Sequence, residues 1–171
     1  MVGWIQAVCE LFEPLYFELI RQVKESFVIQ ADESPLVVLD EDHKDGSKRG
    51  YMWVYAGEGQ VVFDYRPGRN QEAASDFLKE FSGYLQTDGY AGYNQAEREN
   101  GINRLGCMAH ARRYFVEALE TEKAMAEEVL EMISALYEIE KETKEKNPEE
   151  ILVLRKTKSL PVLETLCGYL K

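Results

Sequence analysis

The feature that most constrains the fold is a series of three strand-like segments separated by short polar turns. These segments are rich in Val, Ile, Phe, Tyr and Trp, which strands favour, and they comprise residues 27–39, 51–57 and 60–68. Ser34-Pro35 is expected to interrupt the first segment, and residues 41–50 are expected to form a polar turn. Gly57-Glu58-Gly59 permits a tight turn, so the last two segments are predicted to form a hairpin. The three strands are therefore expected to pair as a meander.

Beyond the meander, helical and strand-like segments alternate. Asn70 is expected to cap a helix, because its side chain can accept a backbone N–H of the first turn. The expected elements are a helix over 71–82, a strand from 83, a short helix over 93–100, a strand from 102 and a helix over 109–120. This order is that of the ribonuclease H-like α/β fold, so the fold class predicted is α/β with a ribonuclease H-like mixed sheet and flanking helices.

Helices are predicted on both flanks of this sheet. Residues 4–26 carry an apolar stripe at steps of four, and Pro14 either kinks this helix or begins its second segment. Residues 117–150 hold 12 acidic and 4 basic residues around an apolar helical repeat that Asn147-Pro148 is expected to end. We interpret this block as an acidic amphipathic helix packed on the chain, with a basic partner as the alternative. Residues 149–171 are expected to form two short helices broken at Ser159–Pro161.

Composition excludes several classes of protein. The 171 residues carry a net charge of −11, which argues against a surface that clamps nucleic acid along its whole extent. An enzyme that acts on nucleic acid stays possible, because its catalytic acids would work beside a polyanion with the help of metal ions. The three cysteines are far apart and odd in number, which favours a reducing cytoplasm. No apolar run approaches a membrane span, and the N-terminus lacks a signal-peptide pattern.

Two aspartates stand where strands are expected to end. Asp32 follows the hydrophobic run 27–30, and Asp88 follows the strand around Leu85. If the first and fourth strands are neighbours, the two carboxylates lie close enough to share Mg²⁺ or Mn²⁺, which prefer oxygen ligands. Two such ions can activate an attacking oxygen and stabilise the leaving oxygen of a phosphodiester. On spacing alone, the alternative is that Asp32 caps a turn and Asp88 sits in an Asp-Gly turn.

Four linked sequence blocks favour the metal-binding interpretation of Asp32 and Asp88 over the turn interpretation. They are QADESPLVVLDEDHKDGSKRGYMWVYAG, FDYRPGRN, LQTDGYAGYN and GCMAHARRYFVEAL. In order and spacing these blocks resemble the insertion sequence 66 family of bacterial transposases from about residue 28 to 120. The resemblance implies a DDE-type core with a ribonuclease H-like fold that cuts transposon DNA and joins it to target DNA. It also implies metal held by two Asp and one Glu, with Asp32 and Asp88 matching the two aspartates.

The third carboxylate has no match in this chain. The family places it in an NN.AERAIRP-type motif beyond the second aspartate, and Glu97, Glu99 and Glu117 lie in a different context. The division expected is a helical lead-in over 1–26, an incomplete core over 27–120 and a helical appendage or insertion over 121–171. We interpret the chain as the central piece of a transposase that is inactive alone, located in the bacterial cytoplasm at the nucleoid. The alternative is a non-catalytic remnant that only folds or associates with other chains.

Basic residues near these blocks are candidates for DNA contact. The resemblance favours this role for His110, Arg112, Arg113, Lys48 and Arg49, and a solvated or ion-paired face is the alternative. Arg66, Arg69 and Arg104 belong to the same basic set. The Cys107-x-x-His110 step lacks the further ligands that a zinc site needs, so a structural role in the core is preferred. The partners expected are transposon DNA, target DNA and further copies of the protein, with no membrane.

Overall fold

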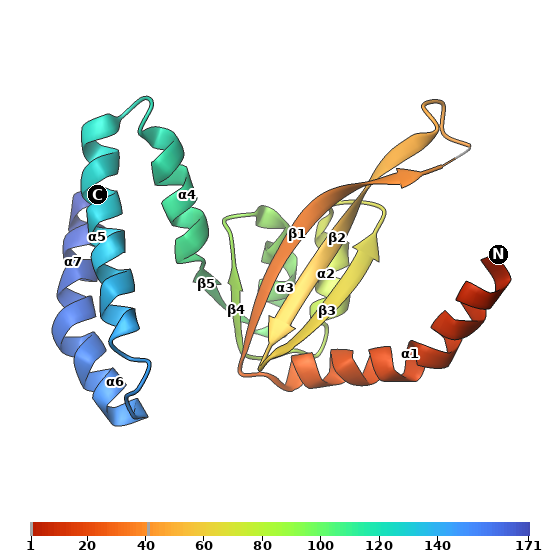
Figure 1. Ribbon diagram of the computed structural model, residues 1–171, viewed down its shortest axis with the longest axis horizontal. Helices are drawn as coiled ribbons and strands as arrows, with labels where there is room; N and C mark the ends of the chain where they lie inside the picture. Colours follow the sequence, from red (N-terminus) through yellow and green to blue (C-terminus); the bar gives the residue numbers. More distant parts are fainter. Residues whose placement is uncertain (1, 41) are drawn as a thin grey trace. The chain divides into compact units, whose positions relative to one another are not determined.

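The computed structural model describes residues 2–40 and 42–171, which divide into two compact units, 1–107 and 108–171. The first unit holds a five-stranded mixed sheet with the strand order β3-β2-β1-β4-β5 (Figure 1). Its elements are α1 (Val2–Glu25), β1 (Val28–Leu39), β2 (Ser47–Gly57), β3 (Gln60–Arg66), α2 (Gln71–Leu78), β4 (Tyr84–Thr87), the 3₁₀ turn η1 (Ala91–Tyr93), α3 (Asn94–Asn100) and β5 (Asn103–Gly106). The predicted meander and the alternation after it are confirmed.

The sheet changes direction of pairing at β1. Strand β1 pairs antiparallel with β2 and parallel with β4, and β4 pairs parallel with β5. The two parallel pairings follow from the crossovers through α2 and through η1 and α3, since parallel neighbours need such a connection. The carboxyl ends of β1 and β4 therefore point the same way.

The core of this unit lies between one face of the sheet and the helices α2 and α3 (Figure 1). Alternate residues of β1 and β2 enter it, including Ile29, Trp53 and Tyr55, and the Tyr55 ring stacks on Phe77 with centroids 3.6 Å apart. The alternation of Trp53 and Tyr55 is thus a core pattern, as preferred from the sequence. Asn70 Oδ1 accepts the Ala73 N–H at 3.2 Å and caps α2 as predicted.

Helix α1 is anchored at its C-terminal half. Val23 is fully buried in the core, and the Tyr16 hydroxyl donates to the Phe63 carbonyl of the edge strand β3 at 3.0 Å. The N-terminal half exposes large apolar side chains, including Trp4 and Leu11. Pro14 lies inside a helix that continues through it, so the prediction of a second helix start at this residue is wrong.

Two predicted strand boundaries are wrong. Ser34-Pro35 does not interrupt β1, which runs from Val28 to Leu39. Pairing with β4 ends at Gln30, so beyond that residue β1 has a partner on one side only. A residue without an N–H donor is tolerated in a strand paired on one side. Strand β2 begins at Ser47, inside the predicted polar turn, because its first residues pair with the far end of β1.

The second unit is helical (Figure 1). Its elements are α4 (Met108–Ala118), α5 (Lys123–Lys141), α6 (Pro148–Leu154), the π-helical turn η2 (Arg155–Ser159) and α7 (Leu160–Tyr169). Helix α5 is the predicted acidic amphipathic helix, and it buries Ala126, Val129, Ile133, Leu136 and Ile139 at steps of three and four. These residues pack against α4 and α7, so the helix supplies the centre of its own unit.

The ends of these helices differ from the prediction. Helix α5 ends at Lys141, and Asn147 instead begins α6 through a capping box with Glu150. The expected break at Ser159–Pro161 is absent, because Pro161 lies in the first turn of α7, where its missing N–H has no helical partner to lose. The predicted functional division at residues 26 and 120 stays a prediction.

Candidate functional site

Asp32 lies on β1, and Asp88 lies in the turn that follows the neighbouring parallel strand β4. Gln30 of β1 is paired with Gln86 of β4, and each aspartate lies two residues beyond its glutamine. Residues two apart on a strand share a face, so Asp32 points to the same face as Gln30. On that face the Gln30 amide donates to the Gln86 Oε1 at 2.7 Å, so side chains at this register meet. Beyond this pair, Asp32 continues along β1, whereas β4 ends at Thr87 and Asp88 begins the turn after it.

The turn that carries Asp88 is held by hydrogen bonds. The Asp88 Oδ1 accepts the backbone N–H of Tyr90 at 2.9 Å. The Arg104 guanidinium donates to the backbone carbonyls of Asp88 and Tyr90 at 3.1 and 2.6 Å, and to Thr87 Oγ1 at 3.0 Å. Its remaining nitrogen donates to Asn94 Oδ1 at 2.5 Å. One arginine from β5 therefore satisfies the carbonyls of the turn and fixes its backbone.

Glu33, next to Asp32, points to the opposite face of β1 and enters the core. Its side chain is 1% exposed and forms an ion pair with Arg69, whose Nε donates to Oε1 at 2.7 Å. The Tyr93 hydroxyl donates to Oε2 at 2.7 Å. Both carboxylate oxygens therefore have a partner, which a buried charge requires.

The charges of this cluster shift the pKa values of its other members. Burial raises the pKa of the Tyr93 hydroxyl, and the negative charge of Glu33 raises it further. Burial lowers the pKa of Arg69, but the hydrogen bond and charge of Glu33 outweigh it, so the pKa lies above its ordinary value. At neutral pH Tyr93 is therefore a neutral phenol and Arg69 a charged guanidinium.

Tyr90 joins this cluster to the Asp88 turn. The Arg69 guanidinium lies over the Tyr90 ring at 3.7 Å from its centroid, and the Tyr90 hydroxyl donates to the Arg69 carbonyl at 2.8 Å. Gly92 makes room for this ring, since a Cβ on Gly92 would lie 2.1 Å from Tyr90 Cε1. The ring is thus enclosed between an arginine and a glycine.

The other predicted residues lie elsewhere. Lys48 and Arg49 are in the first part of β2, where Lys48 forms an ion pair with Asp40 at 2.8 Å and Arg49 is exposed. His110, Arg112 and Arg113 lie on α4 of the second unit, with both arginines exposed. The structure therefore does not group these five residues within one unit.

Three arginines of the basic set make contacts within the first unit. Arg66 pairs with Asp64 at 2.8 Å, while Arg69 and Arg104 make the contacts described above. For these three residues the ion-paired or hydrogen-bonded alternative is the one that the structure supports. Arg66 and Arg69 form ion pairs with carboxylates, and Arg104 donates hydrogen bonds to backbone carbonyls of the Asp88 turn.

Within residues 2–40 and 42–171, no group of three or more His, Cys, Asp and Glu side chains is placed to hold a metal ion. Glu97 and Glu99 are on α3, where Glu99 accepts the Ser75 hydroxyl at 2.6 Å, and Glu117 is on α4. The carboxylates of Asp32 and Asp88 are hard oxygen donors of the kind that Mg²⁺ and Mn²⁺ prefer, so their chemistry is compatible with two ligands of such an ion.

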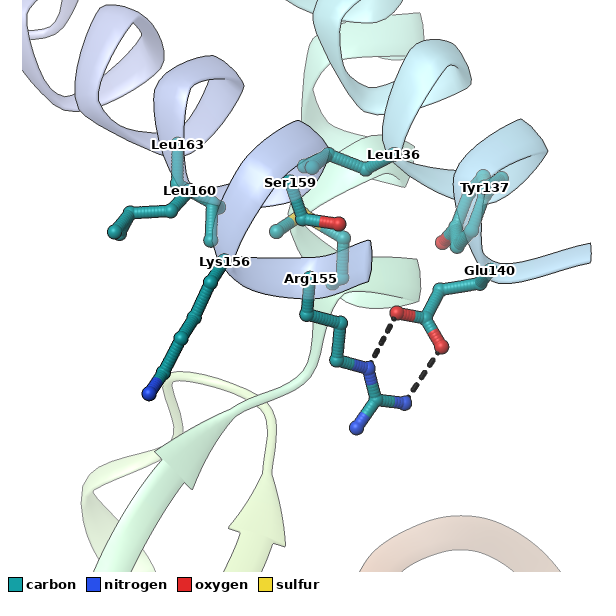
Figure 2. Close-up of a pocket in the computed structure, with 9 residues that line it drawn as sticks. Leu136, Tyr137, Glu140, Arg155, Lys156, Ser159, Leu160 and Leu163 are labelled. Atoms are coloured by element: carbon teal, nitrogen blue, oxygen red, sulfur yellow. Dashed lines mark hydrogen bonds and ion pairs between the residues drawn. The ribbon is translucent and has the colours of Figure 1, made fainter. Parts of the chain in front are cut away.

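The second unit contains an apolar cavity of about 430 Å³ (Figure 2). Leu136 of α5 and Leu160 and Leu163 of α7 line it, and at its rim Arg155 of η2 forms a bidentate pair with Glu140 at 2.8 and 2.7 Å. The hydrogen bonds to Arg155 lower the pKa of Glu140. Ser159, Lys156 and Tyr137 also line the cavity, and its single carboxylate, that of Glu140, is the one paired with Arg155.

The transposase IS66 family model matches residues 1–171 of this chain. The chain belongs to the IS66 transposase family. Two proteins of Sinorhizobium fredii (strain NBRC 101917 / NGR234) are similar to it, the uncharacterized proteins y4jD, 29% identical over 95% of this chain, and y4qI, 28% identical over 97%. This IS66 chain spans about a third of the length of these relatives, 35% and 34%.

Among solved structures, a chain of a simian T-cell lymphotropic virus intasome in complex with the PP2A regulatory subunit B56 gamma is similar to this one. The alignment covers 75% of this IS66 transposase chain and 46% of the chain that it matches, with 13% identity and a TM-score of 0.33. None of the described helices is both long and apolar enough to cross a membrane.

Sequence reasoning missed Glu33 and Tyr93 as members of the site. Both lie inside quoted blocks, Glu33 in ADES and Tyr93 in GYAGY. The signal available was strand alternation, which sends Glu33 to the face opposite Asp32. An acidic side chain on the core face needs a cationic partner, which in the structure is Arg69 of the RPGR segment. The two residues are 36 positions apart, and no rule of sequence spacing connects them.

Proposed function

We propose that this chain is the central part of the catalytic core of a DNA transposase with a ribonuclease H-like fold. In the intact protein, that core would cut transposon DNA and join the freed end to target DNA. One observation supports the proposal: in a transposase-family chain, Gln30 and Gln86 are paired on the adjacent parallel strands β1 and β4, and Asp32 and Asp88 each follow their glutamine by two residues. The three-strand meander followed by two parallel strands supports the proposed fold.

In this proposal Asp32 and Asp88 contribute two ligands of Mg²⁺ or Mn²⁺. The bound metal would lower the barrier to attack on a phosphodiester by stabilising negative charge on the oxygens involved. The protein's own contribution is placement: β1 and β4 hold the two carboxylates on one edge, and the Tyr90 N–H orients the Asp88 carboxylate. A third carboxylate from the intact protein would complete the ligand set, so we expect these 171 residues to be inactive alone.

The partners proposed are transposon DNA, target DNA and further copies of the protein, at the bacterial nucleoid in the cytoplasm. Arg49, Arg112 and Arg113 are exposed, and with Lys48 and His110 they are the residues we propose to lie near DNA. The apolar side chains that α1 exposes, Leu11 and Leu15 among them, support self-association.

Metal binding by the chain tests the proposal directly. Electron paramagnetic resonance of free Mn²⁺ should show one or more sites, and Asp32→Asn or Asp88→Asn should weaken the affinity by roughly 10-fold or more. Asp45→Asn is the matched control, because that carboxylate is on the surface at the far end of the hairpin. Unchanged Mn²⁺ affinity in both site variants would refute the proposed metal site.

A non-catalytic remnant that folds or associates is the second candidate. It is favoured by the lack of a third acid beside the two aspartates in the described part of the chain. Nicking and strand-transfer assays with Mn²⁺ separate the candidates. Activity of the 171 residues that Asp88→Ala abolishes would reject the remnant, whereas no activity from a full-length relative with its third acid intact would support it.

A further inference from the structure

We propose that Glu33 and Arg69 are a positioning pair that sets the orientation of the Asp88 carboxylate relative to Asp32. This inference rests on the proposed function, because it assigns the pair a role toward the two proposed metal ligands. Neither residue would contact the metal, since Glu33 lies on the opposite face of β1 from Asp32.

The first step is the attachment of Arg69 to β1. Glu33 follows Asp32 directly. Its buried carboxylate accepts a hydrogen bond from the Arg69 Nε at 2.7 Å and forms an ion pair with a second nitrogen of the same guanidinium. Arg69 itself lies in the connection between β3 and α2. An arginine paired through two nitrogens is fixed in plane as well as in place. The plane of the guanidinium is therefore set by the strand that carries Asp32.

The second step is the attachment of the Asp88 turn to Arg69. The Tyr90 ring stacks under that guanidinium at 3.7 Å, and its hydroxyl donates to the Arg69 carbonyl at 2.8 Å. The ring lies close to Gly92, where an added Cβ would be 2.1 Å from Tyr90 Cε1. The position of Tyr90 therefore follows that of Arg69.

The third step is the attachment of the Asp88 carboxylate to Tyr90. The Tyr90 N–H donates to Asp88 Oδ1 at 2.9 Å, so a shift of Tyr90 turns the Asp88 side chain. The contacts form one continuous path from Asp32 through its neighbour Glu33, then Arg69 and Tyr90, to Asp88. Arg104 holds the backbone of the same turn from β5, but its contacts are to carbonyls and leave the Asp88 carboxylate to Tyr90.

Arg69→Met breaks this path and keeps a side chain of similar length. The matched control is Arg66→Met, since Arg66 lies three residues earlier and forms ion pairs with Asp64 and Asp76. Two readouts are measured on the folded 171-residue chain. They are Mn²⁺ affinity by electron paramagnetic resonance and hydrogen–deuterium exchange of the segment 88–93 by mass spectrometry.

We expect Arg69→Met to weaken Mn²⁺ binding by roughly 10-fold to 100-fold, the usual effect of losing a partner that orients a ligand. Exchange in 88–93 should quicken, and exchange in β2 should stay unchanged. Arg69→Lys should recover part of the affinity, because it keeps the charge beside Glu33 and lacks the planar face over Tyr90. Arg66→Met should change neither readout.

If Arg69→Met does not fold, Tyr90→Phe takes its place. That change deletes only the hydroxyl bonded to the Arg69 carbonyl and should weaken Mn²⁺ binding severalfold. Wild-type affinity and wild-type exchange in a folded Arg69→Met chain would overturn the inference, as would equal effects of Arg66→Met. A wild-type chain that binds no Mn²⁺ would refute the proposed function, while the exchange readout would still decide whether the path holds the turn.

Discussion

The two partners of the buried ion pair are unequally exposed, so their removal should have unequal effects on stability. The Glu33 side chain is 1% exposed, whereas the Arg69 side chain is 39% exposed. Arg69→Met leaves a buried carboxylate with one remaining donor, the Tyr93 hydroxyl. Glu33→Gln leaves a guanidinium that water reaches from its exposed side. We therefore expect Arg69→Met to lower the free energy of unfolding more than Glu33→Gln does.

The magnitudes follow from the same exposures. Removal of one partner from a buried pair costs about 3–5 kcal/mol, and the partial exposure of Arg69 places its loss at the lower end, ~3 kcal/mol. Glu33→Gln keeps an acceptor of the same shape and costs ~1 kcal/mol. The first unit, residues 1–107, is close to the size at which 1 kcal/mol shifts Tm by roughly 4 °C, so these losses lower its Tm by roughly 12 °C and 4 °C. The double variant, which has no buried charge, should be more stable than Arg69→Met alone.

Urea unfolding followed by tryptophan fluorescence measures these differences in the first unit. Trp53 is fully buried and its ring lies 5.6 Å from that of Tyr93, so its emission reports the core next to the pair. Trp4→Phe removes the exposed second tryptophan and serves as the background for all variants. Equal losses for the two single variants, or a double variant less stable than Arg69→Met, would refute the reasoning from exposure.

Three further predictions concern other parts of the chain. Gly92→Ala should cost about 1–3 kcal/mol, measured by urea unfolding, because the added Cβ would lie 2.1 Å from the Tyr90 ring. Asn147→Ala should lower helicity and cost ~1 kcal/mol in the second unit, and an unchanged circular dichroism melt would contradict the capping box. Burial raises the pKa of the Tyr55 and Tyr93 hydroxyls. The contribution of these neutral phenols to the free energy of unfolding is therefore fully present below the unfolded-state pKa of about 10 and is lost as the pH rises above it. Absorbance at high pH should show the two phenols titrating together with unfolding.

Much of the fold was predictable because its signals are local. Gly57-Glu58-Gly59 places the hairpin turn, and Asn70 caps a helix with its own side chain. The errors came from features that depend on neighbours. Pro35 is tolerated because the pairing of β1 with β4 stops short of it, and α5 ends at Lys141, before the Asn147-Pro148 step expected to end it. Such outcomes depend on which strand or helix lies alongside, which local pattern does not record.

The residues of the candidate site also differ in whether local sequence or neighbouring segments determine their position. Asp32 and Asp88 were singled out because each follows a strand-like run, and the structure pairs those two strands in parallel up to Gln30 and Gln86, two residues before each aspartate. The role of Arg69 was not found, because its partners come from three separate segments. The basic residues were candidates for DNA contact, with a solvated or ion-paired face as the alternative. In the structure, Arg69 pairs with Glu33 and Arg104 donates to backbone carbonyls of the Asp88 turn, both within the first unit.

Strand alternation explains how one short motif serves both parts of the site. In ADES, the alternation of β1 directs Ala31 and Glu33 into the core and Asp32 to the opposite, exposed face. A one-residue slip of β1 would exchange these faces, placing Asp32 in the core and Glu33 outside. Arg69 would then face an aspartate one methylene shorter and displaced along the strand. The ion pair therefore stabilises the register that exposes Asp32, so the buried acid specifies where the exposed acid stands.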